Sequence, residues 1–331
     1  MGAAPEPSAG TGVMATFPSD LLDRPALDAA IVVASRYLDD AVAAATRLSD
    51  RADAEALHDF RVAVRRLRVT LRAYLSLRDG VPRKHRRRLR KLARATNTIR
   101  DAEAQLTWFR DRSARFTASQ RAALVALRAR LRARLRRAQA HSHGKLQRRF
   151  AKLEPRIRRV LTALRSNAGA HEPPFRTIAA ATLVKNVMDL RKRLDDSDAA
   201  SAADLHATRI AAKRLRYLLE PVERDIASGA RLIDRLKRLQ DLFGGLTDAH
   251  ELRAELRRAA ELDQPVGIAA ATKVLEAEVT GLLATLREDW STAGVELEQD
   301  VGAAVGQLRA TRPSAPPNRR RPVRRRSRVP A

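Results

Sequence analysis

Two stretches of the sequence carry histidine and basic residues at the spacing that lines one side of a helix. The first is HDFRVAVRRLR, residues 58–68, and the second is HATRIAAKRLR, residues 206–216. At about 100° per residue, each stretch places its cations in one row. The first row holds His58, Arg61, Arg65, Arg68 and Arg72, and the second holds His206, Arg209, Lys213 and Arg216. Guanidinium groups match phosphate oxygens in bidentate geometry, so these rows predict binding of a phosphate-rich polyanion.

The rows border the predicted buried faces of their helices. Beside the first row, an arc of about 100° that is typical of a core-facing stripe holds Leu57, Phe60, Val64, Leu67 and Leu71. Like charges three and four positions apart destabilise an isolated helix by roughly a few tenths of a kcal/mol per pair, so a functional reason is needed for such a row. Two other interpretations stay open: an ordinary solvated basic surface, and motif histidines that are simply buried and hydrogen-bonded.

The next helix in each half extends the pattern. Arg87, Arg90 and Arg94 form another one-sided row in the first half. In the second half Lys237 corresponds to Arg90, while aspartates replace the other two arginines. The second half is therefore expected to be the weaker electrostatic site.

The matched segments indicate an internal duplication. His58 and His206 are 148 residues apart (206 − 58), and Asp101 and Asp248 are 147 apart (248 − 101). A constant separation over two motifs means that whole halves are duplicated. We expect the two aspartates to orient a neighbouring arginine or to cap a helix.

Apolar residues recur three and four positions apart from about residue 24 to 309, and this periodicity predicts an all-α fold. The segment SNAGAHEPPF predicts a linker between the halves, and AHSHGK (140–145), GG (244–245) and DQPVG (263–267) predict further helix breaks. The predicted organisation is a disordered leader (1–20), one domain (21–309) made of a first half (21–165), a linker (166–177) and a second half (178–309), and a disordered Arg- and Pro-rich tail (310–331).

Composition limits the possible functions. A formal charge of +27 over 331 residues predicts a polyanionic partner: nucleic acid, an anionic membrane surface or free polyphosphate. Aromatic residues are only 4% of the chain, which disfavours binding by base stacking. The absence of cysteine excludes disulfides and thiolate metal sites and fits the cytoplasm. There is no apolar run of the roughly 18 residues needed to span a bilayer.

No set of residues predicts catalysis or a cofactor. The pair HSH (141–143) has no nearby carboxylate pair and is interpreted as a loop, and HELRA from His250 lacks the second histidine of a metalloprotease helix. Phosphate-binding glycine loops and nucleophile motifs are not found. We therefore expect a binding protein with no metal site.

The two motifs, followed by IRDAE and LTDAH, resemble the CHAD family (conserved histidine α-helical domain) over about residues 21–309. The resemblance implies two antiparallel helical bundles with pseudo-twofold symmetry around a basic central cleft, binding of inorganic polyphosphate, and association with polyphosphate granules in some bacteria. The motif positions in this chain are His58, Arg61, Arg65, Arg66, Arg68, His206, Arg209, Lys213, Arg214 and Arg216. Arg66 and Arg214 lie off the main rows and are given lower weight. The Glu-x-Glu-x-Lys signature of the β-barrel domain often fused to the family is missing, since EAEVT (276–280) ends in Thr.

The sequence therefore predicts a non-catalytic polyphosphate-binding protein of the cytoplasm or of polyphosphate granules. An architectural DNA- or RNA-binding protein, which would use the basic surface and the tail, is the first alternative. A metal-dependent phosphohydrolase is the second, and it would need clustered carboxylates that the sequence does not offer.

Overall fold

A computed structural model describes residues 16–50, 53, 55–75, 80–166, 172–195, 202–260 and 265–310. The predicted disordered tail lies outside these residues from 311 onwards, as do the first 15 residues of the predicted leader. The remaining leader residues are included, and there the Phe17 ring packs edge-on against Tyr37 with centroids 5.7 Å apart.

Helices are the regular structure of the described residues, which contain no β-strand and one isolated bridge, so the predicted all-α class is confirmed. The first half contains α1 (Ala26–Arg47), α2 (Ala56–Ala73), α3 (Arg83–Ala95), α4 (Asn97–Asp111), a 3₁₀ turn (Ser113–Arg115), α5 (Ala118–Ala123) and α6 (Val125–Ser166). The second contains α7 (Phe175–Asp195), α8 (Ala202–Leu219), a 3₁₀ segment (Glu220–Asp225), α9 (Gly229–Ala260) and α10 (Pro265–Arg309).

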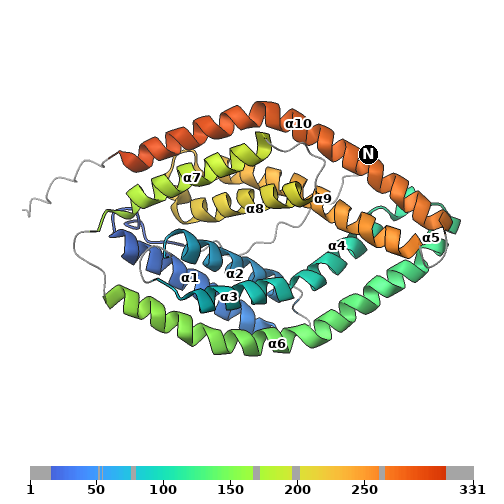
Figure 1. Cartoon of the computed structure of the whole chain (residues 1–331), viewed down its shortest axis with the longest axis horizontal. Helices are drawn as coiled ribbons and strands as arrows, with labels where there is room; N and C mark the ends of the chain where they lie inside the picture. Colours follow the sequence, from blue (N-terminus) through green and yellow to red (C-terminus); the bar gives the residue numbers. More distant parts are fainter. Residues whose placement is uncertain are drawn as a thin grey trace, which may run out of the picture.

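The order of helices repeats between the halves. The starts of α1 and α7 are 149 residues apart (175 − 26), those of α2 and α8 are 146 apart (202 − 56), and those of α5 and α10 are 147 apart (265 − 118). In Figure 1 most helices of the first half occupy the lower part of the molecule and those of the second half the upper part, with α6 and α10 along the two outer edges and α5 at the right-hand tip beside α10. The helix that corresponds to α3 and α4 together is the single, longer α9.

Two hydrophobic clusters hold the helices together. The larger one includes residues of both halves, among them Leu38 and Leu67 of the first and Leu215 and Leu236 of the second, all fully buried. The smaller one joins α4 and the start of α6 to the end of α9 and the start of α10, at the right-hand tip in Figure 1. Because the apolar faces of both halves enter one core, the position of α2 fixes that of α8, which it contacts.

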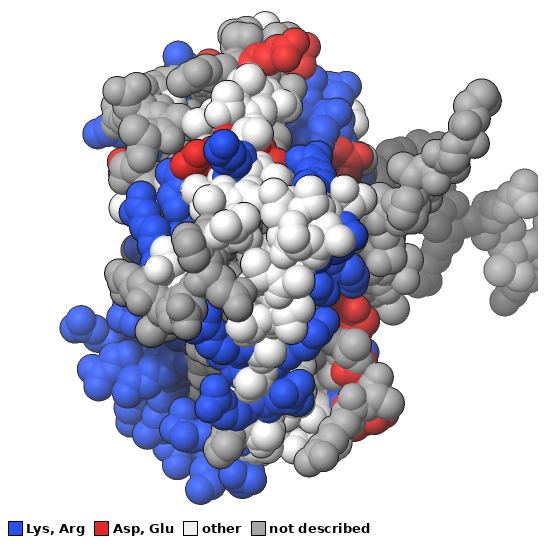
Figure 2. Space-filling view, turned by 90° about the vertical axis from the view of Figure 1, so that its right-hand side faces the viewer, with Lys and Arg blue, Asp and Glu red and all other residues white. Residues whose placement is uncertain are grey.

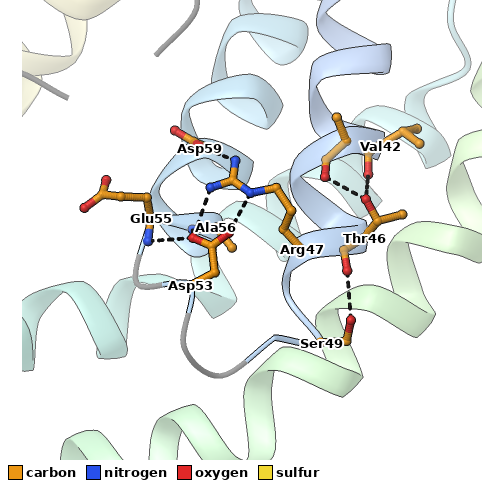
Figure 3. A network of polar contacts seen from close by, with 9 residues as sticks. Val42, Thr46, Arg47, Ser49, Asp53, Glu55, Ala56 and Asp59 are labelled. Atoms are coloured by element: carbon orange, nitrogen blue, oxygen red, sulfur yellow. Dashed lines mark hydrogen bonds and ion pairs between the residues drawn. The ribbon is translucent and has the colours of Figure 1, made fainter. Parts of the chain in front are cut away.

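The connection between α1 and α2 sets the start of the first cationic row. Asp53 accepts hydrogen bonds from the backbone N–H groups of Glu55 (3.1 Å) and Ala56 (2.9 Å), and it also pairs with Arg47 at the end of α1 (Figure 3). Arg47 Nη1 donates to Asp59 at 2.6 Å. The Asp53 carboxylate satisfies free N–H groups at the start of α2, so the helix begins at a defined residue.

The start of α1 is hydrogen-bonded to the residues around the start of α7. The Leu27 backbone N–H donates to Glu172 Oε2 at 2.8 Å, across 145 residues of sequence. Backbone hydrogen bonds also join Ala26 to Pro173 and Phe175 to Arg24, at 3.0 and 2.9 Å. The amino ends of α1 and α7 are thus held side by side.

Two predicted helix breaks are wrong. Helix α6 runs through residues 140–145, because Leu146 and Phe150 beyond the glycine are buried in the core and extend the apolar face. The interpretation of HSH as a loop is wrong for the same reason. Helix α9 runs through Gly244 and Gly245, because the flanking Phe243 and Leu246 are buried in the core and extend the apolar face. Helix α10 approaches closely at Gly245, where a Cβ would lie 3.0 Å from Leu282 Cδ1.

Replacing the two glycines separately tests this packing. Gly244→Ala is expected to raise the free energy of unfolding by about 0.5–1 kcal/mol, since alanine is the better helix former and its Cβ would lie 3.7 Å from Arg209. Gly245→Ala is expected to gain less, because Leu282 must move. Equilibrium urea unfolding measures both, and a loss of stability in Gly244→Ala would contradict a regular helix at this position.

Candidate functional site

A cavity of about 660 Å³ lies between α2, α3, α7 and α8, and we call it the central cavity. Nine of its twenty lining residues are Arg or Lys: Arg65, Arg68, Arg72, Arg90, Arg94, Lys185, Arg209, Lys213 and Arg214. His206 also lines it, and among the described residues no Asp or Glu does. The rest of the wall includes an apolar part on α2, α7 and α8 that contains Val69, Ile178 and Ile210.

Burial and this concentration of positive charge lower the pKa values of several lining groups. Burial, and then the neighbouring Arg209 and Arg65, lower the pKa of Lys213 to about 6. The pKa of His206 also lies below its ordinary value, through burial and the same cations. Burial and four neighbouring arginines lower the pKa of Arg68 to about 10. Each shift disfavours the charged form, so an anion in the cavity would be stabilised.

The structure brings most of the predicted site residues together. Nine residues predicted from the sequence line the central cavity: Arg65, Arg68, Arg72, Arg90, Arg94, His206, Arg209, Lys213 and the lower-weight Arg214. Both rows therefore face the same space, and the row on α3 joins them.

The other predicted residues lie outside the lining. His58 and Arg87 are exposed, and Lys237 is exposed and paired with Asp234 at 2.9 Å. Arg61 is 8% exposed and lies behind the row. Arg66 and Arg216 belong to a second cluster between the halves, which shares Tyr217 with the cavity wall and is described below.

Asp101 and Asp248, which the sequence predicts to orient a neighbouring arginine or to cap a helix, lie close to the motif arginines. Asp248 accepts from Arg100 Nη2 at 3.1 Å and raises the pKa of Arg209, although burial makes the overall shift downward. Asp101 acts in the same sense on Arg61, whose pKa burial lowers to about 10. The Nε atoms of Arg61 and Arg209 are buried and donate to no partner among the described residues. The aspartates therefore offset only part of the charge.

A second polar cluster joins the halves, and we call it the closed crossing: Tyr37, Arg66, Arg216, Tyr217 and Glu220. Glu220, with a side chain only 7% exposed, accepts from Arg66 Nε at 2.7 Å and lies 3.6 Å from Arg216 Nε. The Arg66 guanidinium lies over the rings of Tyr37 and Tyr217, at 5.8 and 5.9 Å from their centroids. Here a buried carboxylate offsets part of the positive charge, and the two tyrosine rings pack against Arg66.

Sequence reasoning missed several polar lining residues, among them Asn97, Thr182, Lys185 and Asn186. Asn186 is 9% exposed and donates to the Thr182 carbonyl at 2.7 Å. A signal for Lys185 did exist, because it is the only charged residue between Arg176 and Asp189. A lone cation in an alanine- and threonine-rich helix suggests an inward role, whereas a solvated face would carry several charges.

The outer surface carries a different basic region. Helix α6 contains fourteen Lys and Arg residues and one acidic residue, Glu154. Figure 2 shows Lys and Arg gathered at the lower left of the face it views, toward the edge where α6 lies in Figure 1. Most of these side chains lie on an open face. Those of the central cavity surround a defined space, where Arg65, Arg68, Arg209, Lys213 and Arg214 are partly buried.

Within the described residues, no group of three or more His, Cys, Asp or Glu side chains could hold a metal ion. None of the helices described is both long enough and apolar enough to cross a membrane.

Comparison with protein-family models matches the CHAD domain over residues 33–257. A crystal structure of the CHAD domain from the plant Ricinus communis has a similar fold, with a TM-score of 0.64 and 22% sequence identity. That similarity covers 90% of this chain and 96% of the plant chain. A comparison with curated proteins finds no match.

The closed crossing makes a prediction about stability. Glu220→Ala is expected to lower the free energy of unfolding by about 3 kcal/mol, because Arg66 is left half-buried without its acceptor. Combining it with Arg66→Met should recover part of the loss. The control Asp39→Ala, which removes an exposed pair with Arg158, should change stability by less than about 1 kcal/mol. Equal urea-unfolding losses in the Glu220 and Asp39 variants would contradict a buried pair.

The central cavity predicts pH-dependent anion binding. With the cavity empty, Lys213 loses its proton above about pH 6, and a bound anion raises its pKa again. Binding above pH 6 therefore takes up a proton, and the affinity should fall with rising pH by at most about tenfold per unit. Calorimetric titration of long-chain polyphosphate, whose internal phosphate groups stay ionised between pH 6 and 9, measures this slope. Lys213→Met should flatten it, and an unchanged slope in that variant would contradict the assignment.

Proposed function

The chain belongs to the CHAD domain family, and from that premise we propose that it binds inorganic polyphosphate, without catalysis, in the central cavity. The observation that carries the proposal is the lining of this cavity, which holds nine Arg and Lys side chains and no Asp or Glu of the described residues. We further propose that the protein acts in the cytoplasm, at polyphosphate granules.

The cavity chemistry suits a chain of phosphates. Arginine stays charged at neutral pH even where its pKa is lowered to about 10, as for Arg68. Its planar group donates two parallel hydrogen bonds to phosphate oxygens. Cations on α2, α3, α7 and α8 surround the space, so successive phosphates would meet donors on several sides. Counterions released from the polyanion would make the affinity fall steeply with salt.

A second candidate function is binding of nucleic acid at the outer surface. The exposed arginines of α6 favour it, because an open basic face can follow a phosphate backbone without enclosing it. The arginine-rich tail, outside the described residues, would add to such a surface. Competition between duplex DNA and polyphosphate at physiological salt separates the two functions, and preferential retention of DNA would favour the second.

Replacing four cavity cations tests the proposed site. The variant carrying Arg65→Ala, Arg68→Ala, Arg209→Ala and Lys213→Ala is expected to lose at least about 100-fold in affinity for long-chain polyphosphate, because each charge-assisted hydrogen bond contributes about 1.5–3 kcal/mol. The salt dependence of log K should also become shallower by about 3. Fluorescence anisotropy with labelled polyphosphate measures both, in the full chain and in a chain ending at Arg309.

A matched control removes the same charge from elsewhere. The exposed α6 arginines at 130, 136, 149 and 159 are changed to alanine together, and this variant should lose less than about fivefold, the long-range effect of net charge. Helical circular dichroism verifies that both variants fold. If the two variants lose affinity equally, the cavity is not the binding site.

A further inference from the structure

The central cavity occupies the place that the duplication relates to the closed crossing. Equivalent positions in α2 and α8 are 148 residues apart, as for His58 and His206. In α1 and α7 the offset is 149, because the buried positions coincide at that value: Ala30 with Ala179, Ala34 with Leu183, Leu38 with Val187, Ala41 with Leu190 and Ala45 with Leu194. Each residue of the closed crossing therefore has a defined counterpart.

The counterparts differ in size and in charge. Tyr37 corresponds to Asn186 (37 + 149), Tyr217 to Val69 (217 − 148), Glu220 to Arg72 (220 − 148), Arg216 to Arg68 (216 − 148) and Arg66 to Arg214 (66 + 148). All five counterparts line the central cavity, and we call them the open crossing. Two aromatic rings and one carboxylate are thus replaced by two smaller side chains and an arginine. Both the space and the excess positive charge follow from these replacements.

The surroundings of the two equivalent arginines show what the open crossing lacks. Arg66 has tyrosine rings on two sides and a buried carboxylate as acceptor. Arg214 pairs with Asp189 at 3.3 Å, and asparagine and valine stand where Arg66 has its rings. A ligand that restores the chemistry of the closed crossing would bring both a flat ring and negative charge.

The apolar part of the cavity wall points to the same kind of ligand. Ile210 is 45% exposed although it faces the cavity, and Ile178 and Val69 also line it. Inorganic polyphosphate has no apolar surface and would leave these side chains in contact with water. A ring laid against them would remove apolar area from water, which contributes about 25 cal/mol per Å².

We propose that the open crossing binds a nucleoside polyphosphate, with the base against Ile178, Ile210 and the Arg214 guanidinium and the phosphates on Arg68, Arg72 and Lys185. The ring would occupy the volume that the tyrosines fill in the closed crossing, where it gains a cation–π contact. The inference rests on the proposed function, since the same arginine-lined cavity takes the phosphates in both cases.

The decisive experiment compares two ligands of the same phosphate count. Adenosine 5′-tetraphosphate has one ionisable group fewer than inorganic tetraphosphate, so electrostatics alone favours the inorganic ligand. The nucleotide is nevertheless expected to bind about tenfold more tightly to the full chain, from ring burial and the cation–π contact. Isothermal titration calorimetry without divalent cations measures both dissociation constants, and their ratio is the readout.

Variants of the cavity wall test whether the ratio of the two dissociation constants depends on the open crossing. Val69→Tyr combined with Asn186→Tyr restores the rings of the closed crossing and should abolish the preference for the nucleotide. Ile210→Ser removes exposed apolar surface and should reduce the preference at least about threefold, and it serves as the test if the double variant does not fold. Met188→Ser is the matched control, since Met188 is 68% exposed on α7 and does not line the cavity. The ratio should be unchanged there.

The outcomes separate this inference from the proposed function. If inorganic tetraphosphate binds as tightly as the nucleotide or more tightly, the inference is overturned while binding of polyphosphate stands. An unchanged preference in Ile210→Ser also overturns it. If the nucleotide binds tightly and long-chain polyphosphate does not, the proposed function falls and the open crossing is a nucleotide site.

Discussion

Mutual repulsion among the cations around the central cavity is the constraint that the rest of the structure has to withstand. Two unit charges about 4 Å apart repel by roughly 4 kcal/mol at an effective dielectric constant of 20, a cost comparable to a large part of a domain's net stability. The described lining contains no carboxylate, and Asp248 and Asp189 behind it offset only part of the repulsion. What opposes the repulsion is apolar burial, since α2 and α8 contribute Leu67 and Leu215 to a single core.

The two crossings show how one duplicated framework supports two different results. In the closed crossing, Glu220 pairs with Arg66 and two tyrosine rings pack against the same guanidinium, so the contact stabilises the junction of the halves. In the open crossing, arginine, valine and asparagine at equivalent positions leave charge and volume. One copy stabilises the molecule and the other keeps a site available. The second half, expected from its aspartates to be the weaker site, still supplies Arg209, Lys213 and Arg214 to the cavity, because α8 faces α2 directly.

The parts of the fold and of the cavity that could be predicted from the sequence are those with a periodic pattern. The helices, the duplication and the cationic rows all repeat at fixed intervals, so the all-α class and most of the cationic cavity residues could be identified without coordinates. Lys185 and Asn186 could not, because they come from a helix with no motif and reach the cavity only through tertiary packing. The glycines of α9 were misinterpreted because their local preference is overruled by the burial of Phe243 and Leu246 in the core, which a local window does not show. From the sequence alone, Arg66 and Arg214 were given the same low weight, although Arg66 is paired and Arg214 faces the cavity. They differ because Arg66 has Glu220 as its partner, whereas the position equivalent to Glu220 in the other half is Arg72.

The hydrogen bond from Leu27 to Glu172 has a consequence for how the protein is made. During translation the whole of α1 leaves the ribosome well over a hundred residues before Glu172 does. The first helix therefore gains this hydrogen-bond acceptor only after the middle of the chain has been synthesised. A fragment that stops at the end of α6 never gains it. The amino-terminal half is thus completed by residues that are synthesised after it.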